Sequence, residues 1–348
     1  MSGIKSLLRP MAVATMATIA SSGALAQEVT LKMHQFLPAQ ANVPTQVLDV
    51  WADKIEAQSD GRIKIDRFPS MQLGGSPPEL MDQAIDGIAD IVWTVVGYTP
   101  GRFPSTEVFE LPFMVEDARA ASCAYWNMFE SGMEDGEFAA LKILGTWVHG
   151  PGVLHTSEPV NTPADLQGMK IRGGSRLVNE LLELAGATPV GMPVPAVSEG
   201  LSKGVIDGTT IPWEVTTALK VPELVEFHTE FEGPALYNLT FVLAMNKGVY
   251  DGMADDLKTV MDENSGLDFS IFAGGTQADA DGPARQFAVD NGNEIITVTD
   301  TSEWEALVRP IYNTWVADLA EKDMDGQALI DEAQALMQGD CKGATAEM

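Results

Sequence analysis

The sequence predicts an α/β protein built as two lobes, and three observations support this prediction. The chain has 348 residues, which is long for a single domain. Its first third alternates strand-like and helix-like segments in the order β-α-β-α-β, as in a sheet flanked by helices. A second strand–helix alternation follows the His-Gly-Pro-Gly turn at residues 149–152, where we expect the chain to cross between the lobes.

In the first lobe, alternating apolar and polar residues predict strands, and apolar residues at helical spacing predict helices. The expected strands span residues 28–36, 62–68, 91–95 and 141–148, and the expected helices span residues 46–59, 79–86 and 117–129. Residues 97–113 are rich in proline and carry few regular signals. A long irregular segment inside a compact protein is often functional, so this segment is a candidate part of a site.

The second lobe begins with a short basic strand at residues 170–172, which ends at Gly173-Gly174. We then expect a helix at 175–185, a strand near Pro189, a helix at 196–203 and a strand around Val205. The remaining elements are a strand at 240–245, a mostly helical stretch at 249–287 with a weak point at Gly274-Gly275, a strand at 295–299, and helices at 302–319 and 326–337. We therefore assign residues 27–151 and 240–282 to lobe I, residues 152–239 and 283–337 to lobe II, and residues 338–348 to a C-terminal tail.

The amino terminus carries the three parts of a secretory signal peptide. Lys5 and Arg9 form the charged region, residues 11–19 are apolar, and Ala24-Leu25-Ala26 matches a cleavage site. We expect residues 1–26 to be removed and the mature chain to start near Gln27. The apolar run is interrupted by threonine and serine and is shorter than the roughly 20 residues of a membrane span, so we expect no direct membrane insertion.

The mature chain is strongly acidic. Without residues 1–26 it has 19 basic and 50 acidic residues, which is a formal charge of −31. Such a charge disfavours nucleic acid and anionic membranes as partners. An anionic ligand would need a local cation to overcome this general field.

The two cysteines, Cys123 and Cys341, suit an exported protein with one disulfide. Two free thiols are the alternative that the sequence leaves open. No Cys-x-x-Cys or Cys/His spacing typical of a structural zinc site is present.

Arg172 is the leading candidate for ligand binding. It lies at the end of a predicted strand, and the carboxyl ends of strands in open α/β sheets face the ligand crevice. Its guanidinium could form a fork of hydrogen bonds to a carboxylate. The alternative is a solvated surface arginine. Rings also gather at predicted strand ends, where they could form either an apolar pocket or the core: Phe36, Trp93, Tyr98, Trp147, Trp213 and Phe241.

Catalytic signatures are absent from the sequence. It has no G-x-S-x-G elbow, no phosphate-binding P-loop, no H-E-x-x-H and no G-x-G-x-x-G. The four histidines, His34, His149, His155 and His228, are far apart, and only His149 stands at the predicted lobe crossing. We therefore expect a binding protein without a cofactor or metal rather than an enzyme.

Three segments carry a family resemblance: D-L-Q-G-M-K-I-R at 165–172, L-A-G-A-T-P-V at 184–190 and L-S-K-G-V-I-D-G at 201–208. Together with L-G-G at 73–75, E-L-P-F at 110–113 and A-M-N-K at 244–247, they resemble the substrate-binding proteins of tripartite ATP-independent periplasmic (TRAP) transporters, the DctP family. The resemblance implies a type II-like periplasmic-binding-protein fold, with mixed sheets flanked by helices and a long helix crossing both lobes. It also implies a periplasmic protein that closes on a small organic anion through Arg172 and delivers it to membrane permease subunits.

Two departures from the family pattern narrow the expected ligand. Gly152 stands where sialic-acid-binding members carry a second arginine, and Ile211 replaces an asparagine that supports the carboxylate. Sugar acids are therefore disfavoured. We expect a monocarboxylate with an apolar or aromatic body, oriented by Arg172 with His149 or Arg102 and bound by a monomeric protein. The full candidate set is Arg172, Trp213, Trp93, His149, Trp147, Phe36, Tyr98, Arg102, Ile211 and Phe241.

Three rival functions stay open on the sequence alone. A metal-assisted keto-acid binding protein would use Glu214 and His149 as metal ligands. A secreted enzyme could act on organic acids. A sensor subunit could bind the same ligand and dock on a membrane kinase.

Overall fold

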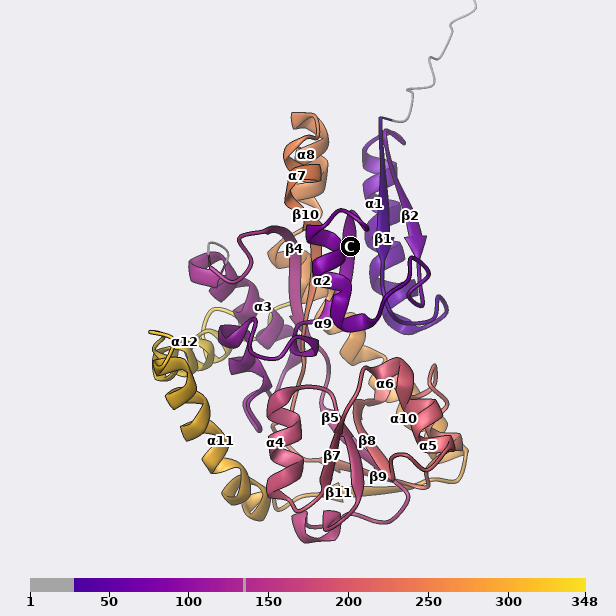
Figure 1. The fold of residues 1–348 in the computed structure, drawn as a ribbon, viewed down its shortest axis with the longest axis vertical. Helices are drawn as coiled ribbons and strands as arrows, with labels where there is room; N and C mark the ends of the chain where they lie inside the picture. The colour runs from indigo at the N-terminus through magenta and orange to yellow at the C-terminus, as the bar shows by residue number, and fades with distance from the viewer. Residues whose placement is uncertain (1–27, 134–135) are drawn as a thin grey trace, which may run out of the picture.

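The computed structural model describes residues 28–133 and 136–348, and the signal peptide predicted at residues 1–26 lies outside the described residues. The described chain forms two mixed sheets, each flanked by helices and stacked one above the other in Figure 1. This arrangement confirms the predicted α/β class.

The first sheet has five strands in the order β2-β1-β3-β10-β4. β1 (Val29–His34) pairs in parallel with β2 (Ile63–Phe68) and β3 (Ile91–Val95). β10 (Thr240–Asn246) lies antiparallel between β3 and β4 (Leu141–Val148), so a late segment occupies the sheet interior. Together with α1 (Asp49–Gln58), α2 (Leu80–Ile85), α3 (Ala118–Met128), α7 (Lys247–Asp251) and α8 (Asp255–Glu263), this sheet is called the first lobe below.

The second sheet has six strands in the order β11-β9-β5-β8-β6-β7. Their bounds are β5 (Gly152–Thr156), β6 (Lys170–Gly173), β7 (Thr188–Gly191), β8 (Gly208–Pro212), β9 (Phe227–Phe231) and β11 (Glu294–Val298). Pro189 is tolerated because β7 is an edge strand, where the missing N–H breaks no interior ladder. With α4 (Arg176–Leu184), α5 (Val197–Ser202) and α6 (Trp213–Thr216), this sheet is called the second lobe.

A long helical segment joins the two lobes, as the resemblance implied. α9 (Leu267–Asp279) and α10 (Asp281–Asp290) follow one another with only Ala280 between them. α9 packs on α3 and β4 of the first lobe, whereas α10 packs on α6 of the second (Figure 1). The chain also passes between the sheets at residues 149–151 and 232–239.

The glycine pair predicted to weaken the helical stretch lies inside continuous α9, so that prediction was wrong. A Cβ on Gly274 would collide with Ser122, and one on Gly275 would collide with Arg119. Both residues belong to α3, so the two glycines allow these helices to pack closely. The actual breaks in the stretch fall between α7, α8 and α9, at residues 252–254 and 264–266.

The strand predicted around Val205 was also wrong. The N–H groups of Val205 and Ile206 both donate to Gly200 O, so these residues cap the end of α5, and the Val205 side chain is 50% exposed. The strand begins later, at Gly208, and its residues are Gly-Thr-Thr-Ile-Pro. Because this buried strand consists mainly of small and polar residues, a search for hydrophobic patterns does not detect it.

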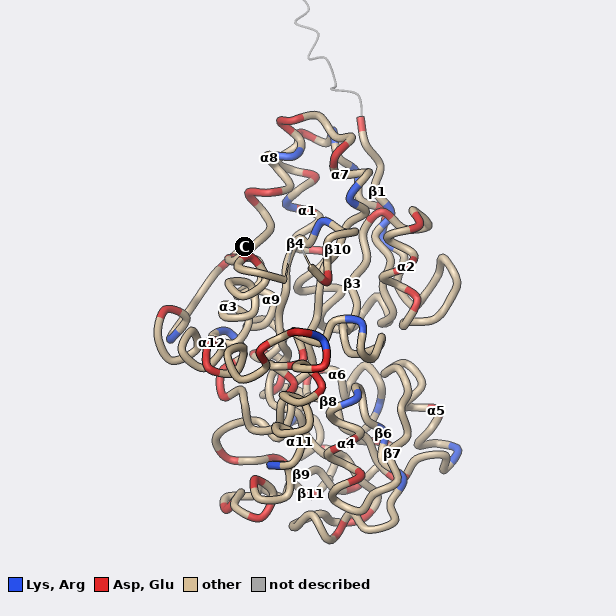
Figure 2. The backbone as a smooth tube through the Cα atoms, turned by 60° about the vertical axis from the view of Figure 1, so that its left-hand side comes forward, with Lys and Arg blue, Asp and Glu red and all other residues tan. Residues whose placement is uncertain are grey.

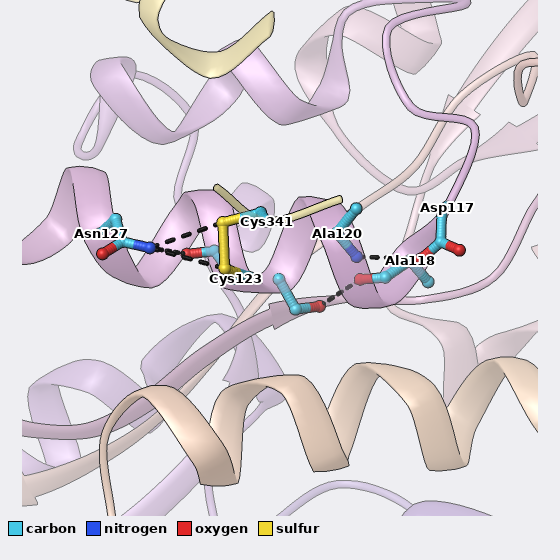
Figure 3. Close-up of a disulfide and its surroundings, with 7 residues drawn as sticks. Asp117, Ala118, Ala120, Cys123, Asn127 and Cys341 are labelled. Atoms are coloured by element: carbon cyan, nitrogen blue, oxygen red, sulfur yellow. Dashed lines mark hydrogen bonds between the residues drawn. A yellow bond between two sulfur atoms is a disulfide. The ribbon is translucent and has the colours of Figure 1, made fainter. Parts of the chain in front are cut away.

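The carboxyl end of the chain returns to the first lobe. α11 (Ser302–Ala320) contacts α4, and α12 (Gly326–Gln338) packs on α3. A disulfide between Cys123 of α3 and Cys341 fastens the tail, and Asn127 Nδ2 donates to Cys123 O at 2.9 Å (Figure 3). The lobe boundaries assigned above stay a prediction.

Acidic residues are distributed over both lobes, with fewer basic residues among them (Figure 2). Within residues 28–133 and 136–348, no helix combines the length and the apolar character that crossing a membrane requires. The surface is therefore that of a highly charged protein, and any anion site must be built locally.

Candidate functional site

A cavity lies between the two sheets, a common place for a small-molecule site. The residues that line it are largely apolar and come from both lobes and from the segments between them. They are Phe36, Leu37, Trp93, Val95, Tyr98, His149, Arg172, Val194, Thr210, Ile211, Pro212, Glu214, Val215, Leu239, Phe241 and Gln277. Seven of the ten predicted site residues are in this set.

Arg172 is the cation of this cavity, and its side chain is 1% exposed. Its Nε donates to Met192 O and its Nη1 to Thr210 O, both at 2.8 Å. Its Nη2 has no hydrogen-bond partner among the described residues, and no carboxylate of the described chain forms an ion pair with Arg172. A buried charge without a countercharge is costly, so this guanidinium is prepared to receive an anion.

The local sequence explains how Arg172 reaches the cavity. It is the third residue of β6, which ends at Gly173, and Thr210 Oγ1 donates to Arg172 O at 3.0 Å. A Cβ on Gly174 would approach Arg172 Nη1 to 3.1 Å and the Leu239 side chain to 2.7 Å. The glycine after the strand therefore leaves the space that the guanidinium occupies.

Stacked rings form one wall of the cavity. Phe36 and Trp93 have centroids 4.6 Å apart at an interplanar angle of 21°, and Phe241 stacks on Trp93 at 5.6 Å. Trp147 continues the stack behind them, 6.3 Å from Trp93 and nearly parallel to it, but it does not line the cavity. Because each ring is fixed by the next, the wall is rigid and apolar.

Tyr98 connects the two lobes beside Arg172. It follows β3 of the first lobe, and its hydroxyl accepts a hydrogen bond from Val194 N of the second lobe at 2.9 Å. Burial raises the pKa of Tyr98, and nearby Arg172 opposes that rise. The hydroxyl is therefore protonated at neutral pH and keeps a proton to donate.

His149 faces the cavity as a neutral ring. Its Nδ1 is hydrogen-bonded to Gly150 O, and its Nε2 accepts a hydrogen bond from Leu239 N at 3.0 Å. Burial lowers the pKa of His149 to about 4, and Arg172 adds to this lowering. Because both ring nitrogens bind backbone groups, His149 contributes shape rather than a free hydrogen-bonding or metal-binding atom.

A series of buried side-chain hydrogen bonds ends at Glu214. Trp147 Nε1 donates to Gln277 Oε1 at 3.0 Å, and Gln277 Nε2 donates to Glu214 Oε1 at 2.7 Å. Burial, with a smaller contribution from Asp281, raises the pKa of Glu214 to about 8, so the carboxyl is largely neutral at pH 7. Glu214 entered the sequence analysis only as a possible metal ligand, but no cluster of three or more potential ligands occurs in the described part of the chain.

The structure places three predicted site residues outside the cavity. Trp147 lies behind Trp93, as described above. Trp213 packs on His155 and His228, with centroids 5.1 and 4.9 Å away, because α6 turns its first side chain away from the cavity. Arg102 is on the surface, where its Nη1 pairs with Asp82 Oδ1 at 2.7 Å.

Two mixed α/β lobes joined by crossing segments, with one buried cation in an apolar cavity between them, define a solute-binding protein for a small anion. The family model described as bacterial extracellular solute-binding protein, family 7 (DctP), matches residues 34–318, and the chain belongs to this family. It is a TRAP solute-binding protein and not an enzyme.

Solved structures with similar folds extend this comparison. A TRAP solute-binding protein from Rhodoferax ferrireducens in complex with copurified benzoate is 46% identical, with a TM-score of 0.87 over 89% of this chain and 97% of that chain. A marine metagenome protein specific for aromatic acid ligands, with 3-hydroxybenzoate, is 42% identical, with a TM-score of 0.87 and coverage of 90% and 99%. A Bordetella bronchiseptica TRAP periplasmic protein with bound mandelate is 27% identical, with a TM-score of 0.83 and coverage of 89% and 98%.

Proposed function

We propose that this protein captures a small aromatic monocarboxylate between its lobes and delivers it to the membrane permease of a TRAP transporter. The observation that carries the proposal is the Arg172 guanidinium, which is buried, lacks a carboxylate partner in the described chain and lines an otherwise largely apolar cavity. One cation suits one carboxylate, because a second anionic group would be buried without a partner.

The shape of the cavity supports an aromatic body. The wall of Phe36, Trp93 and Phe241 offers flat rings, and Ile211 lines the opposite lobe with an apolar side chain. Each ring contact with an aromatic ligand adds about 0.5–1.5 kcal/mol beyond burial. The benzoate and 3-hydroxybenzoate bound by the two relatives above 40% identity agree with this preference.

Gly152 argues against sugar acids. A Cβ at this position would collide with the Tyr237 ring, so the site has no room for the second arginine expected of sialic-acid-binding members. Tyr237 is itself buried next to the cavity residues. A polyhydroxylated ligand would lose water without finding enough hydrogen-bond partners in such a site.

Ligand entry requires the lobes to separate, because Arg172 is enclosed. Contacts that join the lobes include the hydrogen bond between Val194 N and Tyr98 and the pairing of Arg176 of α4 with Glu107. The Glu107 carboxylate accepts from Arg176 Nη2 at 2.6 Å and from Nε at 3.2 Å. Closing over the ligand excludes water and strengthens the ion pair with Arg172. The ligand shifts the lobes towards the closed state only by its higher affinity for that state.

The proposed function also implies a periplasmic location. The segment at residues 1–26 would direct the chain to the periplasm, where a soluble carrier can meet the permease. The disulfide between Cys123 and Cys341 agrees with an oxidising compartment.

Thermal unfolding with a panel of acids tests the proposal, because a bound ligand raises apparent stability by RT ln(1 + [L]/Kd). The panel contains benzoate, phenylacetate, a branched-chain acid, a keto acid, a C4 dicarboxylate and glucuronate. We expect the aromatic monocarboxylates to raise Tm most. A larger shift with glucuronate or with the dicarboxylate would refute the aromatic assignment. Repeating the panel in EDTA separates direct binding from metal-assisted binding.

A further inference from the structure

We propose that Glu214 is a specificity-determining residue that binds a hydroxyl group on the body of the ligand, which makes a hydroxylated aromatic acid the preferred substrate class. This inference rests on the proposed function and deepens it. It gives the cavity two polar anchors, Arg172 for the carboxylate and Glu214 for the hydroxyl.

The geometry of Glu214 carries the inference. Its side chain lines the cavity and is 4% exposed, and its Oε2 has no hydrogen-bond partner among the described residues. Its Oε1 is held by Gln277 Nε2, which in turn is fixed through Trp147. An unpaired buried oxygen is unfavourable, and a ligand hydroxyl at Oε2 would relieve that cost.

The main chain of Glu214 is also held in place by a hydrogen bond. Glu214 N donates to Asp281 Oδ1 at 2.8 Å, so the first residue of α10 fixes the start of α6. Gln277 comes from the last turn of α9, near the point where the α9–α10 segment passes from the first lobe to the second. Glu214 is therefore attached on two sides and presents its free oxygen in a defined place, as selective recognition of a hydroxyl requires.

The chemistry of the site favours a hydroxyl over other groups. A second carboxylate would lie near two acidic residues, Glu214 and Asp281, with no second cation lining the cavity in the described chain. A hydroxyl both donates and accepts hydrogen bonds, so it can pair with Oε2 whether or not that oxygen carries the proton. Burial, which raises the pKa of Glu214, makes the donating form available at neutral pH.

The test compares ligands that differ only in this group. Isothermal titration calorimetry measures benzoate, the 2-, 3- and 4-hydroxybenzoates and the matching methylbenzoates on the full mature chain. In the wild type, we expect one hydroxybenzoate isomer to bind more tightly than benzoate and at least about 10-fold more tightly than the methyl compound of the same position.

Variants then assign the preference to one residue. The measured quantity is the ratio of hydroxybenzoate to benzoate affinity, in which general effects of a substitution on the cavity cancel. We expect Glu214→Leu to reduce this ratio about 10-fold or more, and Glu214→Gln to keep most of it, because an amide still donates and accepts. Arg172→Lys should weaken both ligands and leave the ratio within about threefold, because its effect is on the carboxylate.

The outcomes separate the two proposals. If wild-type protein binds benzoate but prefers no hydroxybenzoate over the methyl analogue, the role of Glu214 is overturned while the aromatic monocarboxylate assignment stands. An unchanged ratio in Glu214→Leu overturns it in the same way. If the wild type binds none of these acids, the proposed function fails and this inference fails with it. Even if Glu214→Leu does not fold, the wild-type ligand series can still overturn the inference, because the inference requires the hydroxyl preference to appear there.

Discussion

Replacing Arg172 by lysine is the perturbation whose effect can be worked out most fully from the structure. Arg172 uses Nε and Nη1 for the carbonyls of Met192 and Thr210 and leaves Nη2 for the ligand. A lysine has one nitrogen and cannot serve all three directions, and its ammonium is harder to bury than a guanidinium. Losing one charge-assisted hydrogen bond costs about 1.5–3 kcal/mol, which corresponds to a Kd about 10- to 150-fold weaker.

Calorimetric titration of benzoate into wild type, Arg172→Lys and Arg102→Lys measures this effect with a matched control. Arg102 was also predicted to bind the ligand, but it pairs with Asp82 on the surface. We therefore expect the Arg102 variant to bind within about twofold of wild type, since surface ion pairs contribute little. Undiminished affinity in Arg172→Lys would refute the assignment of Arg172 as the carboxylate anchor.

Three further predictions concern stability and closure. Serine at both Cys123 and Cys341 should lower the free energy of unfolding by up to about 5 kcal/mol, because the bridge spans 218 residues, and denaturant titration of the oxidised wild type and the variant checks this. Burial raises the pKa of Glu214 from 4.5 to about 8, so the stability linked to its neutral form is complete below about pH 4.5 and is lost as pH rises towards 8. Glu214→Gln should therefore flatten the fall in Tm between about pH 5 and pH 8, and an unchanged slope would contradict the burial argument. Arg176→Gln removes the contact with Glu107 across the lobes and should weaken benzoate about 2- to 10-fold through faster dissociation, which stopped-flow measurement can detect.

Much of the fold could be predicted because its strands and helices carry clear periodic signals. The strand at residues 141–148 has the predicted bounds, and the helix predicted at 175–185 surrounds α4, with Ser175 as its N-cap. Both elements combine strong hydrophobic patterns with recognisable ends. Periodicity and capping are local properties, so a single sequence reveals them.

The elements that sequence analysis missed are strands rich in buried polar residues. β5 and β9 contain His155 and His228, whose Nδ1 atoms form a hydrogen bond of 2.6 Å inside the sheet. This hydrogen bond helps to satisfy both buried rings, and it joins residues 73 positions apart. A local sequence pattern does not reveal such a distant partner, so the sequence analysis assigned no element to either segment.

Part of the candidate site could also be predicted from the sequence. Arg172 and Trp93 could be found because they lie on short strands whose carboxyl ends gather in one crevice. Gln277 could not be found, because it lies inside a predicted helix, in the last turn of α9, and not at a strand end. The direction of Trp213, which points away, depends on the turn of α6 and not on its place in the sequence.

A crystal structure of the protein with benzoate tests the central claim most directly. We predict one benzoate in the cavity between the lobes, with a carboxylate oxygen within hydrogen-bond distance of Arg172 Nη2 and the ring against the wall of Phe36, Trp93 and Phe241. A benzoate held elsewhere, or in the cavity with its carboxylate turned away from Arg172, would contradict the account.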